Sequence, residues 1–155
     1  MLSKLLLAWD GQWFLKTVQA VGLEKAIEQN TLVRTSFAKI EMREMLRLLG
    51  VEKAQNLANA IEIIQQYVVL FGGNRLQTDW AIDGAFHLTI KVRRCPAVEG
   101  AKKAGLKRVD QPCVACQHLW PAWLSVLLPE KHWNCTILAS IGRGADTCHI
   151  EVGTK

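Results

Sequence analysis

A short stretch, "DQPCVACQHLW" at residues 110–120, holds the side chains most able to do chemistry in this chain. Pro112 suits the first position of a helix, which places Cys113 in the first helical turn. Unpaired backbone N–H groups and the helix dipole stabilise an anion at that position. Cys113 is therefore our candidate nucleophile, although a free cysteine is as commonly a small apolar core residue.

The two thiols of this stretch, three positions apart, also form half of a zinc knuckle. A tetrahedral zinc site needs two more thiolate or imidazole ligands, and no second close pair is present. Covalent haem attachment is excluded because Gln117 separates the second cysteine from His118. A thioredoxin-like pair would normally follow a buried strand, whereas a basic segment precedes this one. If zinc or iron is bound, we expect its ligands among Cys95, Cys113, Cys116 and Cys148.

The positive charge of the chain is concentrated beside these thiols. The net charge is +5, and residues 91–110 hold seven basic against two acidic side chains, which alone amounts to +5. Because aromatic residues are not interleaved with these bases, we expect no nucleic-acid partner. A solvated helix face is the common role of such a segment. The alternative is that it favours a thiolate and attracts an anionic ligand, with Arg93 or Arg94 receiving a carboxylate.

Hydrophobic periodicity predicts the helices that must position these residues. Residues 9–21, about 23–49 and 57–71 each repeat apolar side chains at helical spacing, and a glycine follows each segment. Asn30 and Thr31 are where the second helix could be interrupted. The expected inward side chains are Trp9, Trp13, Phe14, Val18 and Val21, then Leu32, Phe37, Ile40, Met45, Leu48 and Leu49, then Leu57, Ile61, Ile64, Tyr67 or Val68, and Phe71.

Beyond the third helix the hydrophobic period changes from 3.6 to 2, which predicts a β-hairpin. Leu76, Trp80 and Ile82, together with Thr78, occupy the even positions of 76–82, and apolar side chains occupy the even positions of 86–92. One shared face therefore requires a loop with an odd number of residues, since a two-residue loop would put the two sets on opposite faces. We expect a three-residue loop at 83–85, which pairs Ile82 with Phe86.

Two helices and a second hairpin are expected in the rest of the chain. "AVEGAKKAG" predicts a short helix, and Pro121 should kink or split the helix after it near Trp120. Residues 133–152 turn back at "GRG", and strand alternation points Cys148 inward. Core packing is the default role for Trp120 and Trp123, and a pocket wall is the alternative.

These elements predict an α+β fold, with N-terminal helices packed on a four-stranded, mainly antiparallel sheet made of two hairpins with a helical insertion between them. At 155 residues we expect one globular domain, with a helical half (1–74) and a sheet half (75–155). No run approaches the roughly 18 apolar residues of a membrane span, and a signal-peptide pattern is lacking. Five cysteines are an odd number, which disfavours a disulfide framework. We therefore expect a soluble, cytoplasmic protein without a membrane partner, and a homo-oligomer stays open.

Three motifs, "RRCPAVEGAKKAG", "QPCVAC" and "GRGADTCHIEV", resemble the family of L-2-amino-thiazoline-4-carboxylic acid hydrolase-like proteins. The N-terminal "WDGQWFLKTVQAVGLEKAIEQN" is similar to a related group of uncharacterised bacterial and archaeal domains. The C-terminal motif also resembles the 4-vinyl reductase domain, which implies an α+β fold that binds small molecules and metals without requiring catalysis. The positions that match the hydrolase-like family are Cys95, Pro96, Cys113, Gly144 and Cys148.

Two functions follow from these observations. The resemblance implies a hydrolase that acts on a C–N bond of a small, anionic, cyclic amidine or amide. Attack would come from the Cys113 thiolate, or from water on a metal held with Cys95 and Cys148, and His118 is the candidate proton carrier. The alternative is a non-catalytic sensor or carrier that binds a metal or an apolar ligand against the tryptophan wall.

Overall fold

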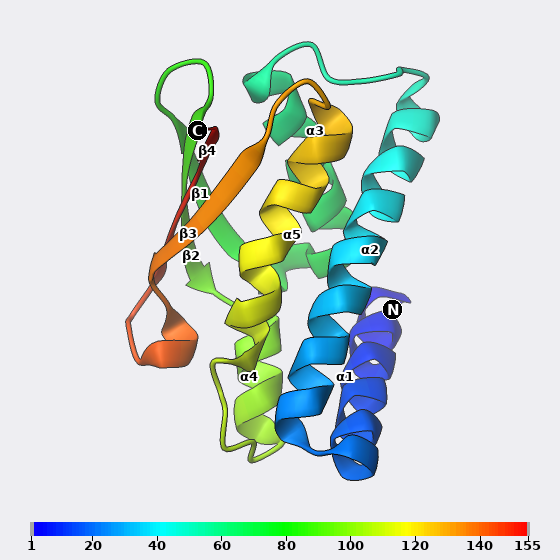
Figure 1. Ribbon diagram of the computed structural model, residues 1–155, viewed down its shortest axis with the longest axis vertical. Helices are drawn as coiled ribbons and strands as arrows, with labels where there is room; N and C mark the ends of the chain where they lie inside the picture. The colour runs from blue at the N-terminus through cyan, green and yellow to red at the C-terminus, as the bar shows by residue number, and fades with distance from the viewer. Residues whose placement is uncertain (1, 155) are drawn as a thin grey trace.

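The computed structural model (Figure 1) describes residues 2–154, without the side chains of residues 2, 3, 72 and 74. Its helices are α1 (Leu2–Val21), α2 (Leu23–Leu49), α3 (Leu57–Gly72), α4 (Pro96–Lys103) and α5 (Gln111–Leu127). Its strands are β1 (Gln77–Ile82), β2 (His87–Arg94), β3 (Trp133–Ala139) and β4 (Cys148–Thr154). Two short 3-10 helices are η1 (Gly73–Arg75) and η2 (Ile141–Arg143).

The strands form a four-stranded antiparallel sheet in the order β1-β2-β4-β3, with the helices on one side of it (Figure 1). Helix α5 packs against the sheet and α2 packs against α5. Alternate side chains of the central strands therefore point into the helical layer, and Leu88 and Ile90 of β2 are fully buried there with Leu124 of α5. The α+β architecture expected from the sequence is confirmed.

The first hairpin confirms the parity of the expected loop and corrects its length. Ile82 pairs with Leu88, not with Phe86, so five residues (83–87) separate the paired positions. The count is odd, and the apolar side chains of both strands share the face that meets the helices. The longer turn is closed by the Asp83 N–H, which donates to the carbonyl of His87 at 3.0 Å.

The second hairpin joins β3 to β4 through η2. Cys135 pairs with Val152, and Ile137 pairs with Ile150, so the core-facing side chains of the two strands meet on one face. Cys148 is buried at the start of β4, which confirms that it points inward.

Helices α2 and α5 are continuous where the sequence suggested breaks. Asn30 and Thr31 lie within α2, and Pro121 lies within α5 without splitting it. Proline removes the N–H that would bond to the carbonyl of Gln117. Because Gln117 is exposed, water can satisfy that carbonyl, and the helix continues.

The buried face is as expected for α3 but not for α2. Leu57, Ile61 and Ile64 of α3 are buried. On α2 the expected inward side chains are mostly exposed, Met45 excepted, because apolar residues occupy more than one side of this helix and periodicity alone does not choose among them. The side chains that α2 buries are Ala26, Ile27, Ala38, Glu41, Met42, Met45 and Leu46.

Helix α1 also differs from expectation. Trp9, Trp13 and Val21 are exposed, whereas Phe14 is buried against the first turn of α2. Among the described helices, none is both long and apolar enough to cross a membrane.

Candidate functional site

The cysteine region lies where α5 begins. Cys113 is buried in the first turn of α5, and η2 passes directly over it. A Cβ atom at Gly142 would lie 3.0 Å from Cys113 Sγ, so only a glycine leaves room for this contact. At the first residue of η2, the Ile141 N–H donates a hydrogen bond to Cys148 Sγ at 3.4 Å. The tight packing around both sulfurs is that of a core.

Burial sets the protonation of most of these thiols. It raises the pKa of Cys95, and the neighbouring Cys148 and Cys113 raise it further. It likewise raises the pKa of Cys148 and of Cys116, and it raises that of Cys135 to about 12. Thiols with raised pKa values are protonated near neutral pH and are poor nucleophiles.

Cys95, Cys113 and Cys148 lie in one region, because an ionised thiol at Cys113 would raise the pKa of both Cys95 and Cys148. However, within residues 2–154 no group of three or more His, Cys, Asp or Glu side chains is arranged to hold a metal ion. All five cysteines are free. A zinc or iron centre at Cys95, Cys113, Cys116 and Cys148 therefore finds no support in the geometry.

The side chains expected to assist Cys113 lie elsewhere. His118 is exposed on α5, and no hydrogen bond joins it to Cys113 in the described part of the chain. Arg93 is exposed and bonds Asp79 at 2.7 Å. Arg94 forms a bidentate pair with Glu99 at 2.7 and 3.2 Å. Both guanidinium groups are thus matched by carboxylates at the surface.

The expected tryptophan wall is an interior row of aromatic rings. Trp80 of β1 meets Trp120 edge-on with ring centroids 5.2 Å apart, and Trp120 meets Trp123 at 5.0 Å. Trp123 in turn contacts Tyr67 at 5.7 Å, and Tyr67 stacks on Phe71 of α3. Trp120 and Trp123 are buried, so their rings fill the space between the sheet and the helices.

The middle of this row meets a buried carboxylate that was not predicted from the sequence. The indole N–H of Trp123 donates to Glu41 Oε2 at 2.7 Å, and Arg34 Nη2 lies 3.4 Å from Oε1. Burial raises the pKa of Tyr67, and the adjacent Glu41 raises it further. A signal was present in the sequence, since Arg34 and Glu41 are seven residues apart and share the helix face that holds Ala38.

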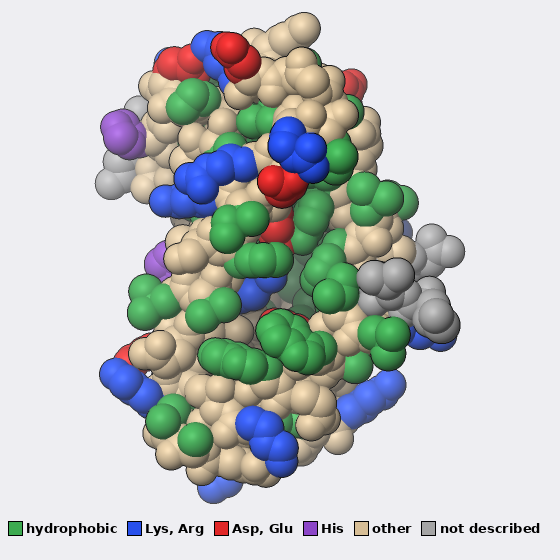
Figure 2. Space-filling model, turned by 90° about the vertical axis from the view of Figure 1, so that its right-hand side faces the viewer, with side chains coloured by type: hydrophobic (Ala, Val, Ile, Leu, Met, Phe, Trp, Pro, Cys, Tyr) green, Lys and Arg blue, Asp and Glu red, His purple; other side chains and the backbone are tan. Residues whose placement is uncertain are grey.

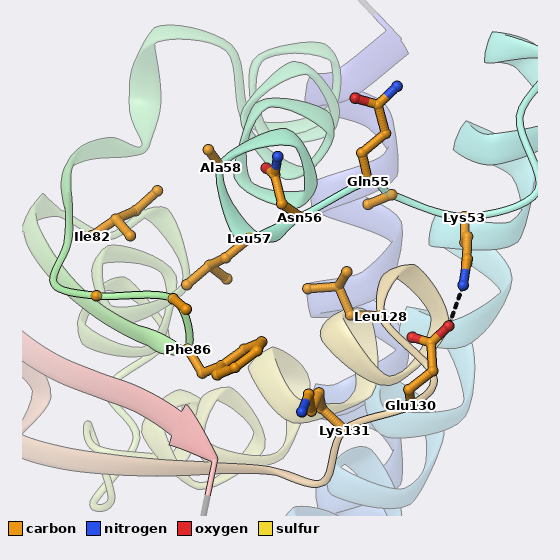
Figure 3. Close-up of a pocket in the computed structure, with 13 residues that line it drawn as sticks. Lys53, Gln55, Asn56, Leu57, Ala58, Ile82, Phe86, Leu128, Glu130 and Lys131 are labelled. Carbon is orange, nitrogen blue, oxygen red and sulfur yellow. Dashed lines mark hydrogen bonds and ion pairs between the residues drawn. The ribbon is translucent and has the colours of Figure 1, made fainter.

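A groove (Figure 3) opens at the end of the helical layer that lies away from α4 in Figure 1. It has a volume of about 700 Å³ and lies between the N-terminus of α3, the tip of the first hairpin and the connection from α5 to β3. Apolar groups of Leu57, Ile82, Phe86 and Leu128 line it (Figure 3). Its volume falls in the usual range for small-molecule sites, roughly 300–1,000 Å³.

The rim of this groove is positive. Lys53 pairs with Glu130, whose pKa is lowered by that contact, while the Lys131 ammonium lies 4.3 Å above the ring of Phe86. Two lysines against one glutamate leave one unmatched positive charge. The first turn of α3 adds backbone N–H groups and the positive end of its dipole, and Asn56 caps it by accepting from the Asn59 N–H at 2.9 Å. The groove therefore favours an anionic group beside an apolar body.

No family model matches the chain, and no curated protein matches it, so the hydrolase-like family suggested by its motifs is not confirmed. The fold, in contrast, is found in solved structures. The phenol-responsive sensory domain of the transcription activator PoxR, crystallised with phenol, aligns with a TM-score of 0.61 at 12% identity over 93% of this chain and 72% of that domain.

A trafficking protein particle complex subunit 3 from Naegleria fowleri, covalently bound to palmitic acid, aligns with a TM-score of 0.65. Its identity is 15%, and the alignment covers 99% of this chain and 95% of that subunit. The chain therefore shares its fold with a sensory domain and with a trafficking subunit, each of which holds a small, largely apolar molecule.

Proposed function

We propose that this protein is a non-catalytic binding domain, a sensor or carrier, for a small molecule with an apolar body and a carboxylate. The ligand occupies the groove between α3, the first hairpin and the α5–β3 connection. The observation that carries this proposal is the combination of an apolar lining with an unmatched ammonium, Lys131, at the rim. An apolar body would cover Phe86 and Leu57, and its carboxylate would meet Lys131 and the first turn of α3.

The two similar structures support a binding role. One holds phenol and the other holds palmitic acid, which are molecules with an apolar part and one polar end. In a fold made of a sheet and a layer of helices, a ligand of this kind can bind at the edge of the core, between the two layers.

A hydrolase is less well supported than a binding domain. The described residues that line the groove include no cysteine, histidine, serine or threonine that could attack a substrate. The cysteines lie instead around the start of α5, on β3 and beside η2, and four of them have pKa values raised by burial.

The test is isothermal titration calorimetry with three ligands of one chain length: decanoate, decanol and decyltrimethylammonium. We expect decanoate to bind most tightly, decanol to bind more weakly and the cation not to bind. Lys131→Gln should weaken decanoate binding about 5- to 10-fold and leave decanol unchanged, since one charge-assisted contact is lost. Lys103→Gln, an exposed lysine of α4, is the matched control and should change neither.

A second variant tests the location of the site. Ala58 lines the groove at the start of α3, and the bulk of Ala58→Trp would narrow the groove there. Binding of both decanoate and decanol should be lost while the circular dichroism spectrum is retained. Decanoate binding that survives Ala58→Trp, or that is unaffected by Lys131→Gln, would refute the assignment of the groove.

A further inference from the structure

Helix α1 presents a stripe of exposed apolar side chains to solvent. Leu5 is 62% exposed, Leu6 44%, Trp9 68% and Trp13 41%. Among the described side chains of α1, only Phe14 is buried. Two tryptophans this exposed are unusual, because aromatic side chains normally dominate cores and interfaces.

The stripe has the spacing of a helix–helix seam. Leu6, Trp9 and Trp13 are separated by three and four residues, which is the 3.5-residue period of side chains that face a partner helix. Leu5 widens the stripe by one position. Lys4 lies away from this seam, whereas Asp10 is four residues from Leu6 and three from Trp13 and therefore borders the seam on one side.

The stripe is large enough to matter energetically. With ordinary side-chain areas, the four exposed fractions amount to about 450 Å² of apolar surface, an order-of-magnitude figure. A stable interface buries about 800 Å² on each partner, of which about two thirds is apolar when two copies of one chain meet. The stripe therefore supplies most of the apolar area that one side of a homodimer interface needs.

We propose that α1 is the dimerisation helix of this protein, and that its stripe packs on the same stripe of a second copy about a twofold axis, with Trp9 in the middle of the contact. A copy of the chain is the matching partner because the stripe supplies most of the apolar area that one side of such an interface needs, while the exposed Asp10 at its border can stay in water. From Lys4 to Asp10 every side chain of α1 except that of Leu7 is exposed, and a partner helix would stabilise this half of the helix.

Hydrophobic side chains gather on the face that includes α1 and α2, as Figure 2 shows. None of the described residues that line the ligand groove belongs to α1. The proposed interface is therefore separate from the groove and does not depend on the proposed function.

The experiment is sedimentation velocity of the full chain between about 1 and 100 µM. We expect a dimer with a micromolar or tighter dissociation constant. Trp9→Glu should raise that constant by at least about 30-fold, because a central aromatic contact is replaced by a charge. Val69→Glu is the matched control, since Val69 of α3 is 67% exposed and lies outside the stripe, and it should leave the dimer intact.

Each outcome decides the proposal. A wild-type protein that stays monomeric at about 100 µM would overturn it, as would a dimer that survives both Trp9→Glu and Leu6→Glu. A dimer broken equally by Val69→Glu would place the interface elsewhere. Circular dichroism of each variant, together with the milder Trp9→Ala, separates loss of dimerisation from loss of folding.

Discussion

The buried hydrogen bond between Trp123 and Glu41 should make a measurable contribution to the stability of the fold. Trp123→Phe removes the indole N–H that lies 2.7 Å from Glu41 Oε2. Glu41 is 6% exposed, so water cannot replace the lost donor. A hydrogen bond to a charged group contributes about 1.5–3 kcal/mol, and the smaller ring leaves a cavity that costs about 1 kcal/mol more. We expect the free energy of unfolding to fall by about 3 kcal/mol, which lowers the Tm by roughly 6–12 °C.

The assay is urea unfolding followed by circular dichroism, with Glu41→Gln and the double variant completing a thermodynamic cycle. The coupling energy between the two positions should be about 1–2 kcal/mol. Trp133→Phe is the control, because Trp133 is also buried but its N–H reaches only the backbone carbonyl of Leu128, at 3.4 Å. If Trp123→Phe costs no more than Trp133→Phe, or if the coupling is below about 0.5 kcal/mol, Glu41 does not depend on this donor.

Two further perturbations test the packing around the thiols. Gly142→Ala should destabilise the fold by about 1–3 kcal/mol, since the new Cβ would lie 2.8 Å from the Cα of Asp110. The control is Gly100→Ala in α4, whose Cβ would meet nothing within 4 Å and which should raise the free energy of unfolding by up to about 1 kcal/mol. If the two alanine variants change the free energy of unfolding in urea by the same amount, the packing at Gly142 is not as tight as the structure indicates. Burial raises the pKa of Cys135 to about 12 from an ordinary value of 9.0, and it also raises the pKa of Tyr67. The unfolded chain therefore loses these protons at a lower pH than the folded chain does. The free energy of unfolding should be level below pH 9 and should fall as the pH rises toward 12. If urea unfolding shows a fall already under way at pH 7, other groups control the pH dependence.

The sequence was most informative where the hydrophobic pattern allowed a single solution. Helix α3 buries Leu57, Ile61 and Ile64, the side chains that its clearest periodicity predicts, although its Val69 and Leu70 are exposed. In the first hairpin, two even-numbered apolar sets had to share a face, which determined the parity of the turn. The exact pairing of Ile82 did not follow, because adding two residues to a turn leaves every side chain on the same face.

The pattern failed on α1 and α2 because both helices are apolar on more than one side. Contact with α5 selected the side of α2 that holds the small Ala38 and the flexible Met42. Trp9 and Trp13 were interpreted as core residues since the sequence does not say whether an apolar stripe is covered by the same chain. Their exposure became evident only when the packing of α1 was known.

The sequence by itself determined the α+β class, the order of its elements, the inward direction of Cys148 and the presence of thiols near the start of α5. These features depend on the local periodicity of apolar residues and on the positions of turn residues, and both can be read from neighbouring residues in the sequence. The tertiary structure decided the rest. It placed Glu41 against Trp123, 82 residues away, and it formed the groove from three segments that the sequence keeps apart. It also buried Cys135 and Cys148, and the raised pKa values of these two thiols follow from a burial that spacing alone cannot reveal.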